Sequence, residues 1–225
     1  MGYDRIGDCF AASVAEQLAY EAWLRDHLVD ITTLCRIISS NYVCIAGGSS
    51  SLEKHIDYID KCDVLVAVDG ATRVLLNNGI IPSIVVTDLD GEWGSLLKAA
   101  DNGSYLVVHV HGDNYRNVLS FITNYNSPYG FMFTHQCPGW GQYSGFVPGF
   151  TDGERALGLT ILCKPGRVVL YGMRTWEKVG YWSKPWLKKN TPPWPSKSRK
   201  LKVAEFFIRL FMIHGLLRGI NAVRR

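Results

Sequence analysis

The sequence predicts an α/β fold with a mostly parallel, Rossmann-like sheet covered by helices on both faces. Six short runs rich in apolar and β-branched residues recur between residues 42 and 171. Most of the segments between them have the length of one helix of three or four turns. Near-continuous apolar strands are typical of a sheet buried on both faces, and strands that alternate with helices favour parallel pairing. The predicted strands are residues 42–46, 64–68, 84–87, 105–110, 131–134 and 167–171.

Helical segments are predicted before and after these strands. Residues 11–40 have apolar side chains at three-and-four spacing and contain neither proline nor glycine, which indicates helix. Residues 198–218 form an amphipathic pattern with one apolar stripe. This last helix can pack on its own sheet or on a second copy of the chain, so the sequence leaves a homo-oligomer open.

Two helix starts carry the pattern of a capping box, in which a Ser or Thr and a Glu three residues later bond each other's backbone. Ser50 and Glu53 fit this pattern after the first strand, and Thr151 and Glu154 fit it before the last strand. The stretch WSKPWLKKNTPPWPSKSRK contains four of the nine prolines and is predicted to be an irregular loop.

The chain has the size of one domain with appendages, at 225 residues. Its 47% hydrophobic and 20% charged residues are typical of an ordinary globular protein. The predicted division is an N-terminal helical segment at 1–40, an α/β catalytic core at 41–173, and a basic loop with the C-terminal helix at 174–225.

Positive charge is concentrated in one segment. Residues 174–202 contain nine Lys or Arg and the single acid Glu177, a charge of +8, whereas the whole chain carries +4. The remainder therefore carries a charge of −4. An acidic body with one basic stretch favours a local anionic partner and argues against a general nucleic-acid binder.

The six cysteines are scattered and form no C-x-x-C pair. Cys44 and Cys163 lie in apolar runs and are predicted to be small core residues. We therefore expect neither a structural zinc site nor a disulfide framework. The chain starts without a signal-peptide pattern, and Arg209 and His214 interrupt its most apolar later stretch. A cytoplasmic location without a membrane partner is expected.

Polar residues follow five of the predicted strands. In an open α/β sheet, ligands bind outside the carboxyl ends of the strands, so these residues are expected to form one site. They are Gly47, Gly48, Ser49, Ser50 and Ser51 after the first strand, Asp69 and Gly70 after the second, Asp88, Asp90 and Gly91 after the third, His109, His111, Asp113 and Asn114 at the end of the fourth, and His135 after the fifth.

Asp88 and Asp90 are the most informative pair. Two carboxylates this close repel each other unless a cation lies between them or both face water. One interpretation is a phosphatase of the haloacid-dehalogenase type with Asp88 as its nucleophile. That nucleophile normally ends the first strand of the core, however, and Glu92 stands where the phosphatase motif has Thr. A magnesium site beside a nucleoside triphosphate fits the surrounding residues better.

Several other strand-end features allow two interpretations each. The turn at 47–51 precedes a predicted helix, so its N–H groups can hold a phosphate or merely close a tight turn. Asp69 can cap the next helix or join the site. Asp152 is explained by the helix dipole or by a role in the site. The basic, tryptophan-rich loop can cover a phosphate as a lid, or it can be a solvated loop with its aromatic side chains packed down.

The spacing of His109, His111 and Asp113 resembles the start of the zinc motif H-x-H-x-D-H. The final position is Asn114, so the metal-binding pattern is incomplete. Alternatively, His111 and Asp113 serve the same site as the paired aspartates, and His109 points back into the sheet.

Four segments, in this order, resemble one enzyme family. They are VAVDGATRVLLNNGIIPSIVVTDLDG, VVHVHGDN, GFTDGERA and LYGM. Together they are similar to the archaeal-type 6-hydroxymethyl-7,8-dihydropterin pyrophosphokinases, which are distant relatives of thiamine pyrophosphokinase. The resemblance runs from about residue 42 to about residue 205. It implies a Mg²⁺-dependent transfer of an intact diphosphate from ATP to the hydroxymethyl group of a reduced pterin, with release of AMP.

The resemblance also implies roles for individual residues, with one departure. The family usually has G-x-G-P-S-L where this chain has GGSSSL. Thiamine as the acceptor, a phosphohydrolase, and a nucleotide- or nucleic-acid-binding module remain as alternatives. The implied metal ligands are Asp88, Asp90 and Asp113; the implied ATP-binding residues are Gly47, Gly48, Ser49, Ser50, Ser51, Asp69 and Gly70; the implied catalytic residues are Asp69, His111, Asp113 and Asp152, of which the first three are the candidate proton acceptors.

Overall fold

The computed structural model describes residues 4–138 and 141–213, and within these residues the chain forms one seven-stranded sheet. The strand order is β6-β5-β4-β3-β2-β1-β7, and all neighbouring strands are parallel. The predicted mostly parallel sheet is therefore confirmed, and the short edge strand β6 is an addition to it. The strands are β1 (Tyr42–Ala46), β2 (Val64–Val68), β3 (Ile84–Thr87), β4 (Tyr105–Val110), β5 (Phe131–His135), β6 (Gly145–Phe146) and β7 (Arg167–Tyr171).

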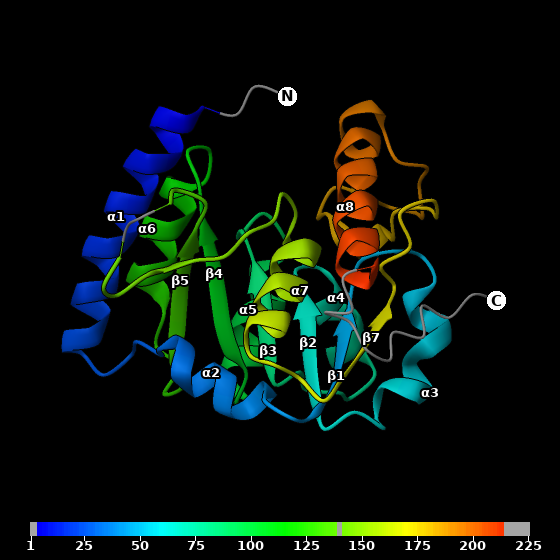
Figure 1. Ribbon diagram of the computed structural model, residues 1–225, viewed down its shortest axis with the longest axis horizontal. Coiled ribbons are helices and arrows are strands. Elements are labelled where there is room, and N and C mark those ends of the chain that lie inside the picture. Colours follow the sequence, from blue (N-terminus) through cyan, green and yellow to red (C-terminus); the bar gives the residue numbers. More distant parts are fainter. Residues whose placement is uncertain (1–3, 139–140, 214–225) are drawn as a thin grey trace.

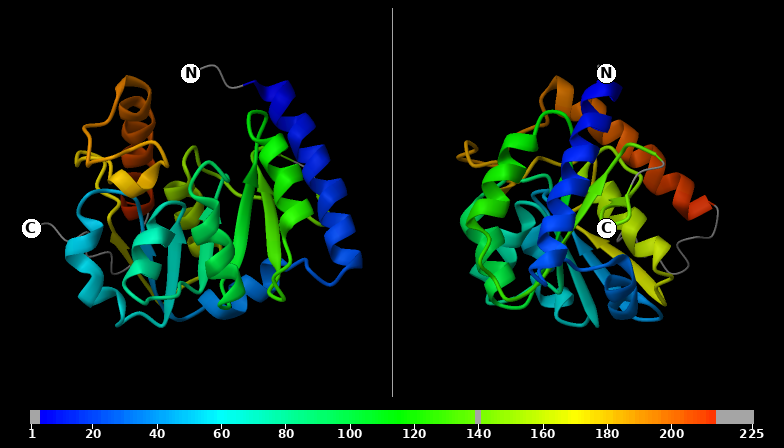
Figure 2. Two further views of the ribbon diagram at one scale, coloured as in Figure 1. Left: turned by 180° about the vertical axis from the view of Figure 1, so that it is seen from behind. Right: turned by 90° about the vertical axis from the view of Figure 1, so that its left-hand side faces the viewer.

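Helices cover both faces of this sheet (Figures 1 and 2). Each face has its own buried cluster, with Leu75 and Phe121 in one and Leu34 and Leu157 in the other. Because both faces are covered, the central strands are apolar throughout. The first face carries α1 (Arg5–Leu24), α3 (Ile56–Ile59), α4 (Ala71–Asn77), α5 (Trp93–Asp101) and α6 (Tyr115–Asn124), and the second carries α2 (Ile31–Ile38) and α7 (Asp152–Leu162), with α8 (Pro195–Ile213) against α7.

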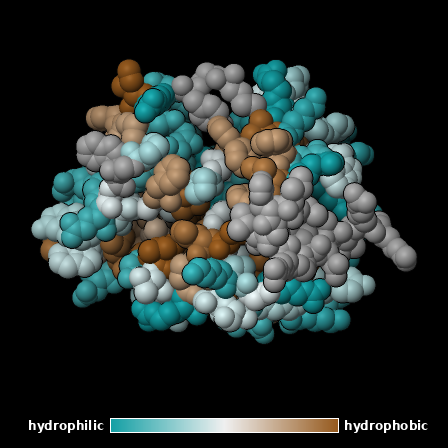
Figure 3. All heavy atoms as spheres, in the orientation of Figure 1, coloured by the Kyte–Doolittle hydropathy of each residue, from teal (hydrophilic) through white to brown (hydrophobic). Residues whose placement is uncertain are grey.

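The second face is the one that Figure 3 shows in space-filling form. Apolar residues are visible in the middle of this view, and hydrophilic residues surround them. No helix in the described part of the chain is both long and apolar enough to cross a membrane.

The chain changes direction at β1, which lies between β2 and β7. From β1 it runs through β2 to β6 on one side, and it then returns through α7 to β7 on the other side. In open α/β sheets, ligands bind in the crevice outside the carboxyl ends of the strands at such a point. Gly47 and Gly172 directly follow β1 and β7, and they lie in contact there.

The predicted helical segment at 11–40 is confirmed, and it consists of two helices, α1 and α2, with a break between them. In the break, Asp26 has a φ of 57°, and the side chain of Asp30 caps α2 by accepting from the backbone N–H of Thr33 at 2.8 Å. The segment between the helices also pairs with the start of β5, since the N–H of Val29 donates to the carbonyl oxygen of Phe131 at 2.8 Å. The spacing of the apolar residues stays helical across this break, so the sequence alone does not reveal the break.

The predicted irregular loop is partly structured. A 3₁₀ turn, η2 (Tyr181–Ser183), lies at its start, and α8 begins at Pro195. Proline is compatible with the first turn of a helix because no intrahelical partner awaits its missing N–H there. Residues 174–194, here called the strap, cross the carboxyl ends of the strands, with Val179 bridged to both Ser49 and Thr191. The part of the predicted last helix beyond residue 213 lies outside the described residues.

One of the two predicted capping boxes is confirmed. Thr151 and Glu154 form it at the start of α7, where the N–H of Thr151 donates to Glu154 Oε2 at 2.9 Å. The box at Ser50 is wrong, because the element that follows is a 3₁₀ turn, η1 (Leu52–His55), without a side-chain cap.

The expectation of no disulfide framework is also wrong. Three disulfides join all six cysteines. Two of them link residues 128 positions apart, so only the folded chain brings their partners together. The pairs are Cys9–Cys137, Cys35–Cys163 and Cys44–Cys62.

Candidate active site

Three carboxylates meet at the carboxyl ends of β2 and β3. One oxygen from each of Asp69, Asp88 and Asp90 lies within 4.8 Å of the others. Asp69 is buried, whereas 46% of the Asp90 side chain is exposed, so the cluster is open on one side. Carboxylate oxygens grouped in this way are the ligands that Mg²⁺ and Ca²⁺ prefer. This donor set therefore fits a hard divalent cation.

The two turns that carry these carboxylates have unusual backbone conformations. Asp69 has a φ of 44° and Leu89 has a φ of 64°, in the left-handed region that non-glycine residues rarely adopt. Thr87 joins the two turns, because its hydroxyl donates to Asp69 Oδ1 and accepts from the N–H of Leu89, both at 2.9 Å. A Cβ on Gly91 would lie 2.9 Å from Asp69 Cγ, so only glycine fits there. Strain of this kind is concentrated at functional sites.

Lys184 of the strap places a positive charge on this cluster. Its Nζ forms an ion pair with Asp90 and lies 3.9 Å from Asp69 Oδ2. Burial alone lowers the pKa of Lys184, but the charges of Asp69 and Asp90 outweigh burial and raise the pKa above its ordinary value. The ammonium group therefore stays protonated and partly neutralises the carboxylates.

The three carboxylates differ in their affinity for protons. Burial, followed by the charge of Asp152, raises the pKa of Asp69. Burial and the charge of Asp88 raise the pKa of Asp90. Burial also opposes ionisation of Asp88, but interactions with His111, Asp90 and Lys184 hold the pKa of Asp88 well below its usual range. Asp88 is therefore the member of the cluster that stays ionised most readily.

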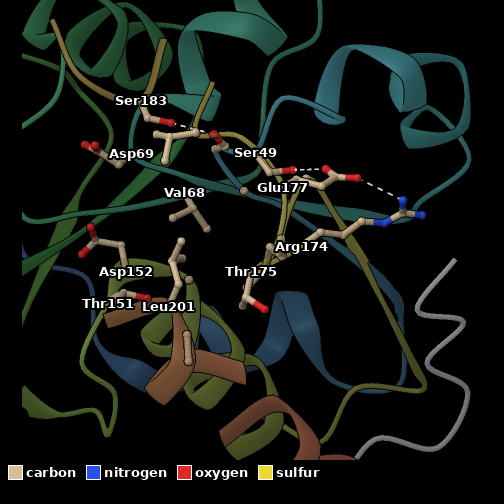
Figure 4. A pocket seen from close by; sticks show the side chains of 18 of the residues that line it. Ser49, Val68, Asp69, Thr151, Asp152, Arg174, Thr175, Glu177, Ser183 and Leu201 are labelled. Carbon is tan, nitrogen blue, oxygen red and sulfur yellow. Dashed lines mark hydrogen bonds and ion pairs between the residues drawn. The ribbon is translucent and has the colours of Figure 1, made fainter. Parts of the chain in front are cut away.

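Asp152 lies at the N-terminus of α7 and lines the same cleft (Figure 4). Its Oδ1 accepts a hydrogen bond from Arg155 at 3.0 Å. Burial, followed by the charge of Asp88, raises the pKa of Asp152 to about 6. A carboxyl group that titrates near neutral pH can exchange a proton during a reaction.

His111 reaches the cluster from the loop after β4. Its Nε2 lies 3.7 Å from Asp88 Oδ2, and its Nδ1 accepts from the N–H of Asp113 at 3.3 Å. Because Nδ1 is the acceptor, the proton of the neutral ring is assigned to Nε2, which faces Asp88. The Asp113 side chain is exposed and is not part of the carboxylate cluster. Asn114 ties this loop to the β3 turn by donating to the carbonyl oxygen of Asp88 at 2.7 Å.

The zinc interpretation of the histidine segment is not supported within the described residues, because the side chains do not converge there. His109 is fully buried in the sheet, with its Nδ1 3.1 Å from Thr134 Oγ1. His135 is likewise fully buried. The expectation that His109 points back into the sheet is confirmed.

The turn at 47–51 already uses most of its N–H groups inside the protein. Those of Gly47, Ser49 and Ser50 donate to carbonyl oxygens of residues 171, 172 and 178 at 2.7–2.9 Å. The Ser183 hydroxyl donates to the carbonyl oxygen of Gly48 at 2.7 Å. The turn is thus joined to the strap and to the segment after β7, and its binding of a phosphate stays a prediction.

A polar cleft extends from the carboxylates along this turn, between the strap, α7 and α8 (Figure 4). Ser49 donates to Glu177 at 2.9 Å, and Glu177 also accepts from Arg174 at 3.0 Å. Lys184 and Lys197 both line the cleft. Burial, followed by the charge of Lys184, lowers the pKa of Lys197. The cleft therefore brings these two lysines next to Asp69 of the carboxylate cluster, as a site for a phosphate chain with a metal requires.

The sequence did not reveal three of the site residues individually. Lys184 was hidden among the nine basic residues of its segment, and only the path of the strap selects it. Thr87 and Arg155 act by fixing Asp69 and Asp152, and no spacing rule marks such contacts. The TDLD motif contains Thr87, so its position beside two aspartates was the available signal.

Comparisons with known proteins agree with the geometry. Residues 23–175 match the family described as 6-hydroxymethylpterin diphosphokinase MptE-like. A Pyrococcus furiosus protein named 6-hydroxymethyl-7,8-dihydropterin pyrophosphokinase is 36% identical over 225 residues, covering 97% of this chain and 95% of that protein. A protein of the same name from Methanothermobacter thermautotrophicus is 33% identical over 221 residues, covering 96% of this chain and 91% of that protein.

Among solved structures, the MAf glycosyltransferase from Magnetospirillum magneticum AMB-1 is similar with a TM-score of 0.44 and 16% identity, over 77% of this chain and 28% of that chain. This similarity supports no functional argument. The family match covers most of the sheet and the carboxylate cluster, and the two relatives match along nearly their whole length. The chain belongs to the MptE-like 6-hydroxymethylpterin diphosphokinase family, as its four sequence segments indicate.

Proposed function

We propose that this chain transfers a diphosphate group from ATP to the hydroxymethyl group of 6-hydroxymethyl-7,8-dihydropterin, in a Mg²⁺-dependent reaction that releases AMP. The names of its relatives support this reaction. The structural observation that carries the proposal is the cluster of Asp69, Asp88 and Asp90 beside a lysine-lined cleft. Diphosphate transfer proceeds without a covalent enzyme intermediate, so it depends on positioning and on neutralising charge.

Asp88 and Asp90 are the proposed Mg²⁺ ligands, and Asp69 supplies a third carboxylate. When bound, the ion neutralises charge on the phosphate oxygens. Thr87 and His111 hold Asp69 and Asp88 in place by the contacts described above. Asp113 as a metal ligand stays a prediction, and because its side chain is exposed and outside the cluster, Asp69 is the proposed third ligand in its place.

The cleft beside the β1 turn is the proposed site of ATP, with residues 47–51, Asp69 and Gly70 along its border. The enclosed volume is about 110 Å³, which is smaller than the volumes of about 300 to 1,000 Å³ usual for such ligands. We therefore propose that the strap moves outwards when ATP binds. In that movement Lys184 exchanges the carboxylates for phosphate oxygens, and Lys197 provides a second positive charge at the same cleft.

The reaction joins the pterin hydroxyl oxygen to the β-phosphorus of ATP. The bond between that phosphorus and the oxygen bridging to the α-phosphorus breaks, and AMP leaves with that oxygen. We assign acceptance of the hydroxyl proton to Asp152, which borders the cleft and titrates near neutrality. His111 is assigned a positioning role, because its Nε2 already carries a proton directed at Asp88.

Incubation with ATP, Mg²⁺ and the reduced hydroxymethylpterin tests the proposal. AMP and the pterin diphosphate are expected in equal amounts. Release of inorganic phosphate from a phosphomonoester would instead support the phosphatase interpretation, and salt-dependent nucleotide or nucleic-acid binding without turnover would support a binding module. Thiamine is included as a second acceptor, because formation of its diphosphate would reassign the substrate while keeping the reaction.

A further inference from the structure

A second cavity lies at the same edge of the sheet, over the ends of β5 and β6. It encloses about 470 Å³, which is within the range of small-molecule sites. Its walls come from the first turns of α1, the segment after β5, the loop before α7, and α8. Figure 1 shows α1 and α8 rising on opposite sides above the carboxyl ends of the strands.

The walls of this cavity are mainly apolar, formed by three phenylalanines, two prolines and the Cys9–Cys137 disulfide, and its polar residues are Arg5, Asp8 and Gln136. Phe150 and Phe207 lie side by side, with ring centroids 5.7 Å apart, and Phe146 is 45% exposed. Such flat side chains offer stacking surfaces for a planar ring. The cavity thus differs from the polar cleft, which several lysines and carboxylates line.

Asp8 is the carboxylate of this cavity, and two hydrogen bonds fix its position. Its Oδ1 accepts from the N–H of Gly112 at 3.0 Å, and its Oδ2 accepts from the Gln136 side-chain amide at 2.5 Å. A carboxylate has about four acceptor sites, so two bonds leave capacity for a ligand. Two adjacent N–H groups on a flat heterocycle, as in an aminopyrimidinone, present a guanidine-like edge that a carboxylate can accept as a pair.

Two residues in the walls of this cavity are joined, by a hydrogen bond or along the chain, to residues of the carboxylate site. Gly112, which donates to Asp8, directly follows His111, whose ring lies against Asp88. On the other wall, Phe150 lies two residues before Asp152. Asp69 thus borders the cleft along the β1 turn, and the second cavity lies beside the segments that carry His111 and Asp152. In-line transfer needs the attacking oxygen and the leaving group on opposite sides of the phosphorus, and two separate cavities allow the acceptor and ATP to be held apart.

We propose that the second cavity binds the planar, N–H-bearing ring of the acceptor, which places its hydroxymethyl group towards Asp88 and Asp152. This inference rests on the proposed function for the identity of the ring. Asp8 accepts hydrogen bonds from the N–H edge of the ring, and Phe207 packs against its face. Asp8 and Phe207 thus become specificity residues for the acceptor and have no role in binding ATP.

The test measures ring binding separately from turnover. Asp8→Asn and Phe207→Ala are compared with Glu21→Gln, an exposed acid on the same helix as Asp8, and Phe206→Ala, whose ring is 61% exposed. Oxidised 6-hydroxymethylpterin is titrated without ATP, and ring fluorescence is followed. Asp8→Asn and Phe207→Ala are each expected to weaken binding by about tenfold or more, and to raise the KM for the reduced acceptor while leaving the KM for ATP unchanged. Thermal melting checks that each variant is folded.

The outcomes separate the two proposals. Equal ring affinities in all four variants and in the wild type would overturn the assignment of the cavity, even if the enzyme forms AMP. If both cavity variants weaken binding of the ring but the wild type forms no AMP, the assignment of the cavity would be supported and the proposed reaction overturned. No binding of the ring by the wild type, together with no AMP, would overturn both.

Discussion

The turn after β1 and the turn after β3 end neighbouring parts of the same sheet edge, but their polar groups point in different directions. In the β1 turn, backbone N–H groups donate into the protein, and glycines allow the strap to approach closely. In the β3 turn, Thr87 and Asn114 hold the backbone by hydrogen bonds, and two carboxylates lie together with that of Asp69.

This difference shows which of two similar sequence signals carries the chemistry. A glycine- and serine-rich turn at the end of a strand favours a phosphate cradle only while its N–H groups are free. Here the strap and the segment after β7 accept most of them. Of the paired aspartates, by contrast, Asp90 pairs with Lys184 and Asp88 lies beside the His111 ring, and no other basic side chain among the described residues forms an ion pair with them. The cation-binding capacity of the site therefore lies in the β3 turn.

The largest expected effect is that of removing a carboxylate from the β3 turn. Asp88→Asn and Asp90→Asn should each lower kcat by about a thousandfold, since a metal that clamps phosphate oxygens stabilises the transition state by several kcal/mol. In the wild type, Mg²⁺ should raise the melting temperature, and this rise should be lost in both variants. Asp57→Asn, an exposed acid in α3, is the matched control. An unchanged Mg²⁺-dependent rise in either active-site variant would contradict the assignment.

The next effect is that of Lys184, which links the strap to the β3 turn. Lys184→Ala should lower kcat/KM for ATP by about ten- to a hundredfold, because a charge-assisted contact to phosphate is lost. The metal-free protein should also melt at a lower temperature, since the carboxylates then repel one another without a counter-charge. Lys188→Ala, an exposed lysine four residues further along the strap, serves as the control. Equal ATP kinetics in the two variants would show that Lys184 acts only in the substrate-free state.

The sheet itself was predictable because every one of its long strands is buried on both faces. Val64–Val68, for example, is apolar throughout, and no amphipathic helix has that pattern. The break between α1 and α2 was not predictable, because Asp26 adopts its positive φ in response to pairing of the following residues with β5. Tertiary contacts of this kind leave no trace in local spacing.

The site was predictable to the extent that its residues directly follow strands. Asp69, Asp88 and Asp90 are gathered by the parallel register of β2 and β3 alone. Lys184 reaches the site, and Asp8 reaches the loop after β4, from segments distant in sequence, and only the folded strap and α1 place them. The disulfides were missed for the same reason, since Cys9 and Cys137 meet through the packing of α1 on β5.

A smaller effect is expected at Gly70, where the strap contacts the chain just after β2. A Cβ on this residue would lie 2.8 Å from the Cα of Ser183 and would also collide with the carbonyl group of Trp182. Gly70→Ala should therefore lower the free energy of unfolding by about 2 kcal/mol and raise the KM for ATP, because the strap is displaced. Gly94→Ala is the control, since the only contact of its Cβ is with the flexible Glu92 side chain. A stable Gly70→Ala variant would show that the strap is held elsewhere.

The smallest effect concerns Glu177, which holds the β1 turn through Ser49. Burial raises the pKa of Glu177, but hydrogen bonds from Ser51 and Ser49 outweigh burial and lower the pKa below its usual value. A carboxyl group with a lowered folded-state pKa stabilises the fold above its unfolded pKa of about 4.3, and this stabilisation is lost as the pH falls through the folded value.

Glu177→Gln should therefore lower the free energy of unfolding by at most about 1 kcal/mol at pH 7, and the stabilities of variant and wild type should converge as the pH falls from about 4.3 through the folded pKa. Glu53→Gln, an exposed residue of the neighbouring 3₁₀ turn, should change neither value. Because the β1 turn is held by several hydrogen bonds besides that of Glu177, Mg²⁺ should raise the melting temperature of Glu177→Gln as much as that of the wild type. A smaller Mg²⁺-dependent rise in the melting temperature of this variant would mean that the two turns are coupled. The β1 turn would then contribute to cation binding, which their separate contacts do not indicate.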